Sequence, residues 1–143
     1  MNLGNGWISA LNIKTEVYPE RNLRWHVITG ALNKEDLLRE LGKLYSAEYY
    51  DQNMNALWDL RKTDFSRITA DDVHEVAEYV QDTEKDVSNY KTALVASNEL
   101  AALGYGVAQM YALLMSSKNH GVVQVFLTVE AAEEWLDEDM EKS

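Results

Sequence analysis

The sequence contains no cysteine, which excludes disulfide bonds and thiolate chemistry. It has only three histidines, His26, His74 and His120, and no two of them stand four residues apart. A histidine-based metal site or catalytic triad is therefore not indicated, and we expect neither a metal nor a cofactor. Each histidine is instead expected to be structural or solvated. No apolar run reaches the ~18 residues of a membrane helix, so membrane insertion is not expected.

Basic residues are also scarce, with 13 Lys and Arg against 24 Asp and Glu and a net charge of −11. Proteins that bind nucleic acid depend on basic surface and counterion release, so nucleic acid is not an expected partner. The segment 1–16 lacks the basic region and apolar run of a secretory signal. Together with the missing cysteine, this leads us to expect a cytoplasmic protein.

The chain has the length of one domain, with 143 residues of which 46% are apolar. No linker, repeat or change in composition divides it. We therefore predict a single domain over 1–143, in which 1–9 and 138–143 form loose termini.

Apolar residues at every second position predict an opening β-hairpin around Pro19. Its two strands carry Leu11, Ile13 and Val17, then Leu23, Trp25 and Val27. Short apolar runs at 55–60, 92–96 and 122–127 predict three buried strands.

Helices are predicted to alternate with these strands. Asn33, Thr69 and Thr128 are expected to cap three of the helices, and Ser97 or Asn98 the other. The expected apolar faces hold Leu37, Leu41, Leu44 and Tyr45, then Val73, Val76, Ala77 and Val80, then Leu100, Leu103, Val107, Met110 and Leu114, and finally Ala131, Trp135 and Leu136. The order ββαβαβαβα predicts an α/β fold with a mixed, mostly parallel sheet of about five strands and about four helices.

Ligands of open α/β sheets bind beyond the carboxyl ends of the parallel strands, so candidate site residues were sought there. Asp59 lies at the end of one predicted strand and Arg61 directly after it, and the two could bind a polar ligand or a partner. The alternative is a structural ion pair that holds the end of the strand. Ser97 and Asn98 follow the next strand and belong to the same candidate surface.

Hydroxyls at the start of the second helix could be phosphorylated, because a phosphate there would meet free N–H groups. Ser66 and Thr69 are the candidates, and the alternative for Thr69 is a plain helix cap. Gly104 and Gly106 could belong to a phosphate-binding loop, or they could let the third helix approach the sheet closely. Tyr49 and Tyr50 could line a pocket or an interface, or pack a terminus onto the domain.

Three segments carry a family resemblance: NALWDLRKTDFS at 55–66, YKTALVASNELAALGYGVAQMYALL at 90–114, and VQVFLTVEAAEEWL at 123–136. Their order resembles that of the SpoIIAA-like, STAS-related proteins of bacteria. That family combines a strand ending in Asp-x-Arg, an Ala-Leu-Val strand, a glycine-containing helix and a closing pattern matched by Phe126, Ala132 (or Ala131), Trp135 and Leu136. The resemblance covers about residues 11 to 137.

The resemblance implies about five strands and four helices, and a regulatory function. Related STAS domains act as anti-sigma-factor antagonists or as regulatory domains, and some are switched by phosphorylation at the second helix. Here that stretch, 64–69, departs from the family's Asp-Ser-Ser-Gly-Leu. The fold class has also been compared with lipid-carrying CRAL-TRIO domains.

Two functional hypotheses follow. The first is a non-enzymatic regulatory or protein-interaction module with a protein partner, for which a homodimer is possible. The second is a small carrier of an apolar or lipid-like ligand, suggested by Tyr105, Met110, Tyr111 and Met115 on the apolar third helix. An enzyme ranks third, because no catalytic set of residues stands out.

Overall fold

The computed structural model of the chain describes residues 11–51, 53–84, 90–97, 102–117 and 122–138. Its elements follow the predicted order ββαβαβαβα. They are β2 (Asn12–Tyr18), a 3-10 turn (Pro19–Arg21), β3 (Leu23–Ala31), α1 (Lys34–Tyr45), β4 (Asn55–Asp64), α2 (Ala70–Thr83), β5 (Lys91–Val95), α3 (Ala102–Ser117), β6 (Val122–Phe126) and α4 (Val129–Leu136).

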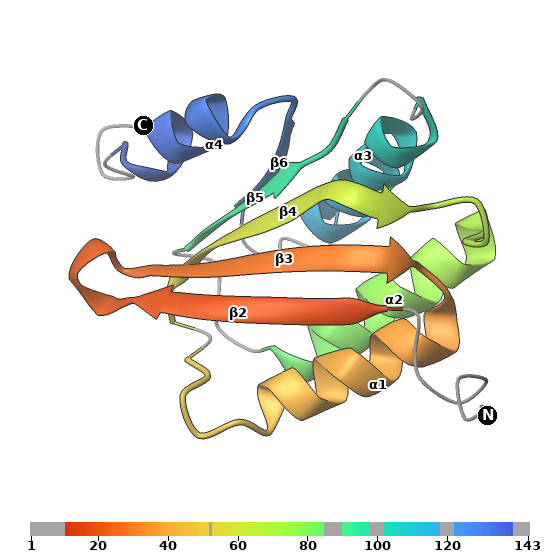
Figure 1. Cartoon of the computed structure of the whole chain (residues 1–143), viewed down its shortest axis with the longest axis horizontal. Helices are drawn as coiled ribbons and strands as arrows, with labels where there is room; N and C mark the ends of the chain where they lie inside the picture. The colour runs from red at the N-terminus through yellow and green to blue at the C-terminus, as the bar shows by residue number, and fades with distance from the viewer. Residues whose placement is uncertain (1–10, 52, 85–89, 98–101, 118–121, 139–143) are drawn as a thin grey trace, which may run out of the picture.

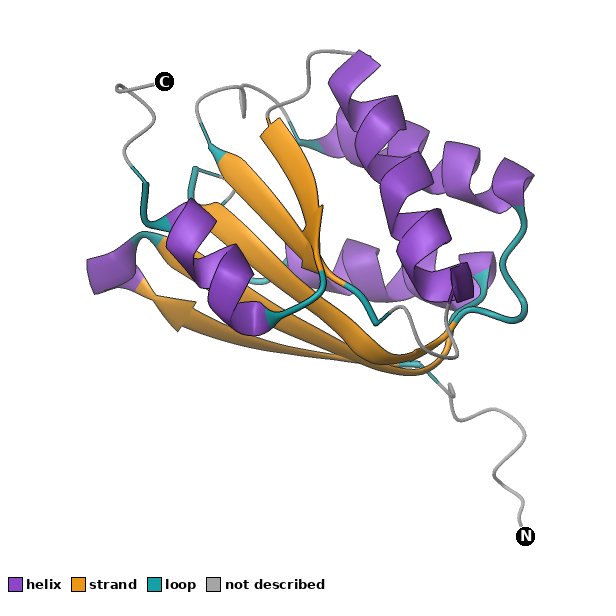
Figure 2. Ribbon diagram, turned by 90° about the horizontal axis from the view of Figure 1, so that it is seen from above, coloured by secondary structure: helices purple, strands orange, loops and turns teal. Residues whose placement is uncertain are grey.

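The five described strands form one sheet in the order β2-β3-β4-β5-β6. The β2–β3 hairpin is antiparallel, and all later pairs are parallel, which confirms the predicted mixed sheet. Figure 1 shows α1, α2 and α3 gathered apart from α4, and Figure 2 shows the sheet between these two groups. The central strands are therefore covered on both faces, which explains their nearly continuous apolar sequences.

Three predicted helix caps are confirmed. The side chain of Asn33 accepts a hydrogen bond from the N–H of Asp36 at 2.9 Å. Thr69 and Asp72 form a reciprocal capping box at the start of α2, and Thr128 accepts from the N–H of Ala131 at 3.1 Å. These polar residues satisfy N–H groups that would otherwise lack partners, so each helix begins where the sequence places it.

The sheet separates two apolar cores. The larger core lies between the sheet and α1–α3, and it contains most of the predicted apolar faces of α1 and α2, in which Leu44 and Val73 are also buried. The smaller one lies under α4 and comprises Leu23, Leu57, Ala93, Val95, Ala132 and Leu136. Leu23 and Leu57 belong to this second core, whereas Ile28 and Leu94 face the first, as the alternation of side chains along a strand requires.

The predicted apolar faces of α3 and α4 are partly wrong. Of the α3 residues whose burial is described, the buried side chains are Ala108, Ala112 and Met115, whereas Val107, Met110 and Leu114 are only half-buried. The predicted Leu100 lies outside the described residues. In α4 the buried alanine is Ala132, and Ala131 is exposed. Helix α3 is apolar nearly all round, so its periodicity does not reveal the buried side, and alanines rather than leucines face the sheet. No helix in the described part of the chain is long and apolar enough to cross a membrane.

Candidate functional site

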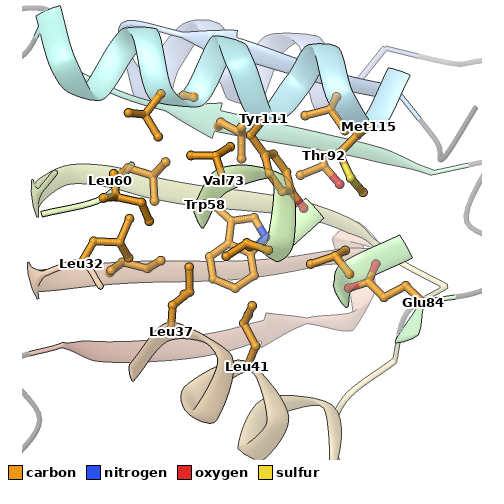
Figure 3. Close-up of a pocket in the computed structure, with 18 of the residues that line it drawn as sticks. Leu32, Leu37, Leu41, Trp58, Leu60, Val73, Glu84, Thr92, Tyr111 and Met115 are labelled. Atoms are coloured by element: carbon orange, nitrogen blue, oxygen red, sulfur yellow. The ribbon is translucent and has the colours of Figure 1, made fainter. Parts of the chain in front are cut away.

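The main feature of the first core is a partly enclosed cavity of about 130 Å³ between the sheet and helices α1, α2 and α3. Figure 3 shows its walls, with side chains from all these elements pointing toward a common space. Leu32 and Leu60 lie at one end, and Glu84 and Thr92 at the other. The walls between them are apolar and include Leu37, Leu41, Trp58, Val73, Tyr111 and Met115.

The polar groups of the cavity lie at the amino ends of the parallel strands. Arg24 of β3, Ala56 of β4 and Thr92 of β5 lie side by side near the starts of their strands. Arg24 and Thr92 both line the cavity, and Glu84 follows the last turn of α2. This is the opposite edge from the one where the sequence-based search placed its candidates.

Arg24 is buried, with 3% of its surface exposed, and it begins a short polar chain. Its Nη1 lies 3.0 Å from Nε2 of His26, and Nδ1 of His26 lies 2.8 Å from the hydroxyl of Thr15. Because a guanidinium can only donate, Nε2 of His26 must accept. The proton of the neutral ring is therefore on Nδ1 and is donated to Thr15.

The environment of His26 keeps its ring neutral. The ring is fully buried and stacks on Trp58, with 4.0 Å between the ring centroids. Burial, reinforced by the positive charge of Arg24, holds the pKa of His26 well below its ordinary value. The sequence-based expectation of a structural histidine is consistent with this position, but the sequence did not reveal its contact with a cavity-lining arginine.

Glu84 lines the polar end of the cavity, and Tyr50 connects it to Arg24. The guanidinium carbon of Arg24 lies 4.5 Å from the centroid of the Tyr50 ring, and the Tyr50 hydroxyl donates to Glu84 at 2.7 Å. Burial raises the pKa of Tyr50; the charge of Arg24 opposes this and the Glu84 carboxylate adds to it. Burial and then Glu84 also raise the pKa of Tyr111. Both tyrosines therefore remain protonated beside the carboxylate.

A second buried cation, Lys91, lies on the other side of the sheet and has complete partners. Its ammonium group donates to the carbonyls of Trp135 at 2.6 Å and Glu138 at 2.7 Å. It also lies 5.1 Å from the centroid of the Trp135 ring. These carbonyls are at the carboxyl end of α4, where a positive charge is favourable. Lys91 therefore ties the predicted loose end at residue 138 to β5.

The predicted candidates Asp59 and Arg61 form an ion pair with each other. Two nitrogens of the Arg61 guanidinium lie 2.9 and 2.8 Å from the two Asp59 carboxylate oxygens, and the main-chain N–H of Arg61 donates to the same carboxylate at 3.1 Å. Burial alone would raise the pKa of Asp59, but the hydrogen bonds and charge of Arg61 outweigh it and lower that pKa.

The backbone explains why this pair forms. Val27 pairs with Asp59 and Thr29 pairs with Lys62, so β4 has one extra residue opposite β3. Such a bulge leaves ladder groups without their regular partners, and the Asp59 carboxylate accepts the N–H of Arg61 at this point. Asp59 is two residues from Leu57 and shares the face toward α4, so the pair is separated from the cavity by the sheet.

The other predicted residues are dispersed. Ser66 is exposed, and its N–H donates to Asp64 at 2.9 Å, while Thr69 serves as the cap of α2. Phosphorylation of either stays a prediction. Ser97 lies half-buried after β5, and Asn98 lies outside the described residues. Gly104 is buried, but Gly106 is exposed and a Cβ on it would meet nothing within 4 Å, so close packing on the sheet is the wrong interpretation for Gly106.

The carboxyl ends of the strands do not include Arg24 and Glu84, which line the cavity, or His26, which contacts Arg24, so the sequence-based prediction missed them. The sequence does contain a signal for these residues: Arg24 and His26 share one face of β3 with the apolar Ile28. The hairpin is predicted from the other face of this strand, where Leu23, Trp25 and Val27 alternate with polar residues. In a sheet covered on both sides both faces of a strand are buried, so a charged residue on either is informative. Among the described residues, no cluster of three or more His, Cys, Asp or Glu could hold a metal ion.

Comparisons with known proteins support the fold. No protein-family model matches the chain, and no curated protein matches it. A solved structure does: an uncharacterized protein of the DUF3478 family from Shewanella loihica PV-4, described as having a SpoIIAA-like fold. The TM-score is 0.55 at 14% sequence identity, over 90% of this chain and 95% of that one. The chain therefore has a SpoIIAA-like fold, as its sequence motifs predicted.

Proposed function

We propose that this SpoIIAA-like domain binds a small apolar molecule in the cavity between its sheet and helices α1–α3, without catalysing a reaction. The observation that supports the proposal is the cavity itself, which has an apolar wall and a few polar groups gathered at one end. Ligand sites commonly combine these two features, because apolar walls supply the binding energy and a few polar groups orient the ligand.

The volume limits the size of the ligand. An apolar cavity of about 150 Å³ can hold benzene, so the volume of about 130 Å³ fits a molecule of comparable size. Of the apolar or lipid-like ligands of the carrier hypothesis, this volume favours a small apolar molecule.

Two measurements test the proposal. Native mass spectrometry of gently purified protein is expected to show a bound small molecule. Titration with toluene, followed by NMR of methyl groups, is expected to shift the resonances of Leu37, Val73 and Met115, which line the cavity. If toluene leaves all three unchanged, the cavity does not bind apolar molecules and the proposal is wrong.

A matched pair of variants locates the binding. Ala108 of α3 is buried and lines the cavity, so Ala108→Leu fills part of the space and should weaken toluene binding at least about tenfold. Leu113 lies on the same helix but is 70% exposed and does not line the cavity, so Leu113→Ala is the control. Equal affinity of the two variants would place the binding elsewhere.

A protein-interaction role is the second candidate. A shallow groove between α3 and β6 is lined by Gln109, Leu113, Ser116 and Gln124, among others, and β6 is an edge strand of the described sheet. Leu113 and, at the start of β6, Val122 are exposed apolar residues there. Exposed apolar side chains beside a strand edge are typical of contact surfaces. Homodimer formation would use the same kind of surface.

A pull-down from the source cell tests this second candidate. Leu113→Glu is expected to abolish the recovery of a reproducible partner, whereas Tyr49→Glu, which changes an exposed aromatic residue in the loop after α1, is expected to keep it. The variant Ser66→Ala tests the predicted phosphorylation in the same experiment. Recovery that is unaffected by Leu113→Glu would exclude this groove as the contact surface.

A further inference from the structure

The polar end of the cavity contains a buried guanidinium with unused hydrogen-bond donors. A guanidinium has five N–H groups. Arg24 uses Nη1 toward His26, but its buried Nε has no hydrogen-bond partner. None of the ion pairs formed within the described part of the chain includes Arg24. A buried positive charge thus lines the cavity without an ion-pair partner among the described residues.

A buried guanidinium without a counterion lowers the stability of the fold unless another group pairs with it. A buried charge loses its hydration, and neither the neutral acceptor of His26 nor the face of the Tyr50 ring replaces a counterion. The other buried charged side chains among the described residues have partners: Lys91 has two carbonyls, and Asp59 has Arg61. An anion in the cavity would give Arg24 the charge-assisted hydrogen bonds that the described chain does not.

Glu84 restricts which anion can bind. Its carboxylate lines the same end of the cavity and accepts from the Tyr50 hydroxyl, while the Tyr50 ring faces Arg24. A second negative charge nearby disfavours a doubly charged group such as phosphate more than a singly charged one. The small volume and the overall charge of −11 act in the same direction. A carboxylate is a singly charged, planar group that fits a guanidinium.

We infer that the ligand of the cavity is a small monocarboxylic acid, whose apolar part fills the space between the sheet and α1–α3 and whose carboxylate pairs with Arg24. The inference rests on the proposed function and adds the class of ligand to it. Glu84 stays bound to the Tyr50 hydroxyl, and His26 holds the guanidinium in place from the side of the sheet.

The test compares hexanoate with 1-hexanol, which has the same number of carbon atoms and no charge. Both are titrated at neutral pH into the whole protein and followed by NMR. Hexanoate is expected to bind about ten- to a hundredfold more tightly, which is the typical gain from a hydrogen bond to a charged group. The Nε–H resonance of Arg24 is expected to shift with hexanoate and to move less with hexanol.

Three variants assign the preference to Arg24. Arg24→Met is expected to remove the preference while hexanol still binds, and Arg24→Lys, which keeps the charge, is expected to keep part of it. Arg67 is exposed in the loop before α2, so Arg67→Met is the matched control and should bind as the natural chain does.

The outcomes separate the inference from the proposed function. If hexanol shifts the cavity methyl groups and hexanoate binds no more tightly, the carboxylate assignment is wrong and the cavity still binds apolar molecules. If neither compound shifts those groups, the proposed function is wrong as well. Should Arg24→Met fail to fold, the comparison of the two ligands on the natural chain, together with the Arg24 Nε–H resonance, decides the question.

Discussion

Two buried cations of the described chain, Arg24 and Lys91, lie near the amino ends of the parallel strands β3 and β5, which flank β4, but on opposite faces of the sheet. Lys91 lies under α4 and donates to two carbonyls at the end of that helix. Arg24 faces the cavity, donates to one histidine and has a nitrogen without a partner. The same fold thus contains one buried cation whose hydrogen bonds are made within the chain and one whose guanidinium has a nitrogen without a partner.

This difference separates a residue kept for stability from one suited to binding. A side chain that stabilises the fold has partners already in the folded chain, so its removal is costly. A side chain prepared for a ligand has unused donors, so its removal costs the unbound protein little and costs the complex much. The two faces of the sheet can therefore be distinguished by stability measurements before any ligand is known.

The largest expected effect comes from Lys91. Lys91→Met removes two charge-assisted hydrogen bonds and a cation at the carboxyl end of α4, so we expect the free energy of unfolding to fall by about 3 kcal/mol. Arg24→Met is its counterpart. It loses the hydrogen bond to His26 but also removes a buried charge, so the change should stay within about 1 kcal/mol.

Urea unfolding of both variants measures this comparison. A loss for Arg24→Met as large as that for Lys91→Met would show that Arg24 is also a structural cation, and it would contradict the distinction between the two faces.

The second effect compares two buried helical alanines that face the sheet from opposite sides. Ala132 of α4 is fully buried in the smaller core and does not line the cavity, so Ala132→Leu overpacks that core and should cost about 2 kcal/mol. Ala108 of α3 borders the cavity, so Ala108→Leu has space to occupy and should stay within about 1 kcal/mol of the natural chain. Thermal or urea unfolding measures both, and equal losses would mean that the cavity side is as tightly packed as the α4 side.

The third effect is the pH dependence caused by His26. Its pKa in the folded protein is well below the ordinary value of 6.5, because burial and the charge of Arg24 disfavour the protonated ring. The unfolded chain therefore binds the proton first as the pH falls. The stability that His26 contributes is complete above its ordinary pKa and is lost below it. Between about pH 7 and about pH 5.5 this loss should reach about 1.3 kcal/mol.

Unfolding measurements at the two pH values check this prediction. His26→Gln is expected to remove this part of the pH dependence, since glutamine can still accept from Arg24 but does not titrate in that range. His74→Gln changes an exposed histidine of α2 and is the matched control. If the stability of both variants depends on pH as that of the natural chain does, the neutral, buried state of His26 is not the cause of the pH dependence.

The sequence was sufficient for the fold because each element has a local signal. Asn33, Thr69 and Thr128 mark helix starts by hydrogen bonds that depend on neighbouring residues only. The amphipathic faces of α1 and α2 are confirmed for the same reason. Helix α3 has no such polar face, so its buried side depends on what packs against it, and the sequence-based prediction was wrong there.

The candidate site could not be predicted in the same way because it joins distant parts of the chain. Arg24 is in the hairpin, Tyr50 follows α1 and Glu84 follows α2, and no spacing rule connects them. The rule that directs attention to the carboxyl ends of strands led instead to Asp59 and Arg61. A charged residue within the second strand of the hairpin was the one available clue, and it is informative only when both faces of that strand are known to be buried.

The smallest expected effect concerns that Asp59–Arg61 pair. The Arg61 side chain is 47% exposed, and an ion pair with one exposed partner contributes little. We therefore expect Arg61→Met to lower the free energy of unfolding by less than about 1 kcal/mol. The main-chain N–H of Arg61 keeps its bond to Asp59 in this variant, so the bulge in β4 remains intact. Hexanoate affinity should also be unchanged, because the sheet separates this pair from the cavity. If Arg61→Met has natural stability but binds hexanoate more weakly, the ligand site lies near the carboxyl ends of the strands and not in the cavity.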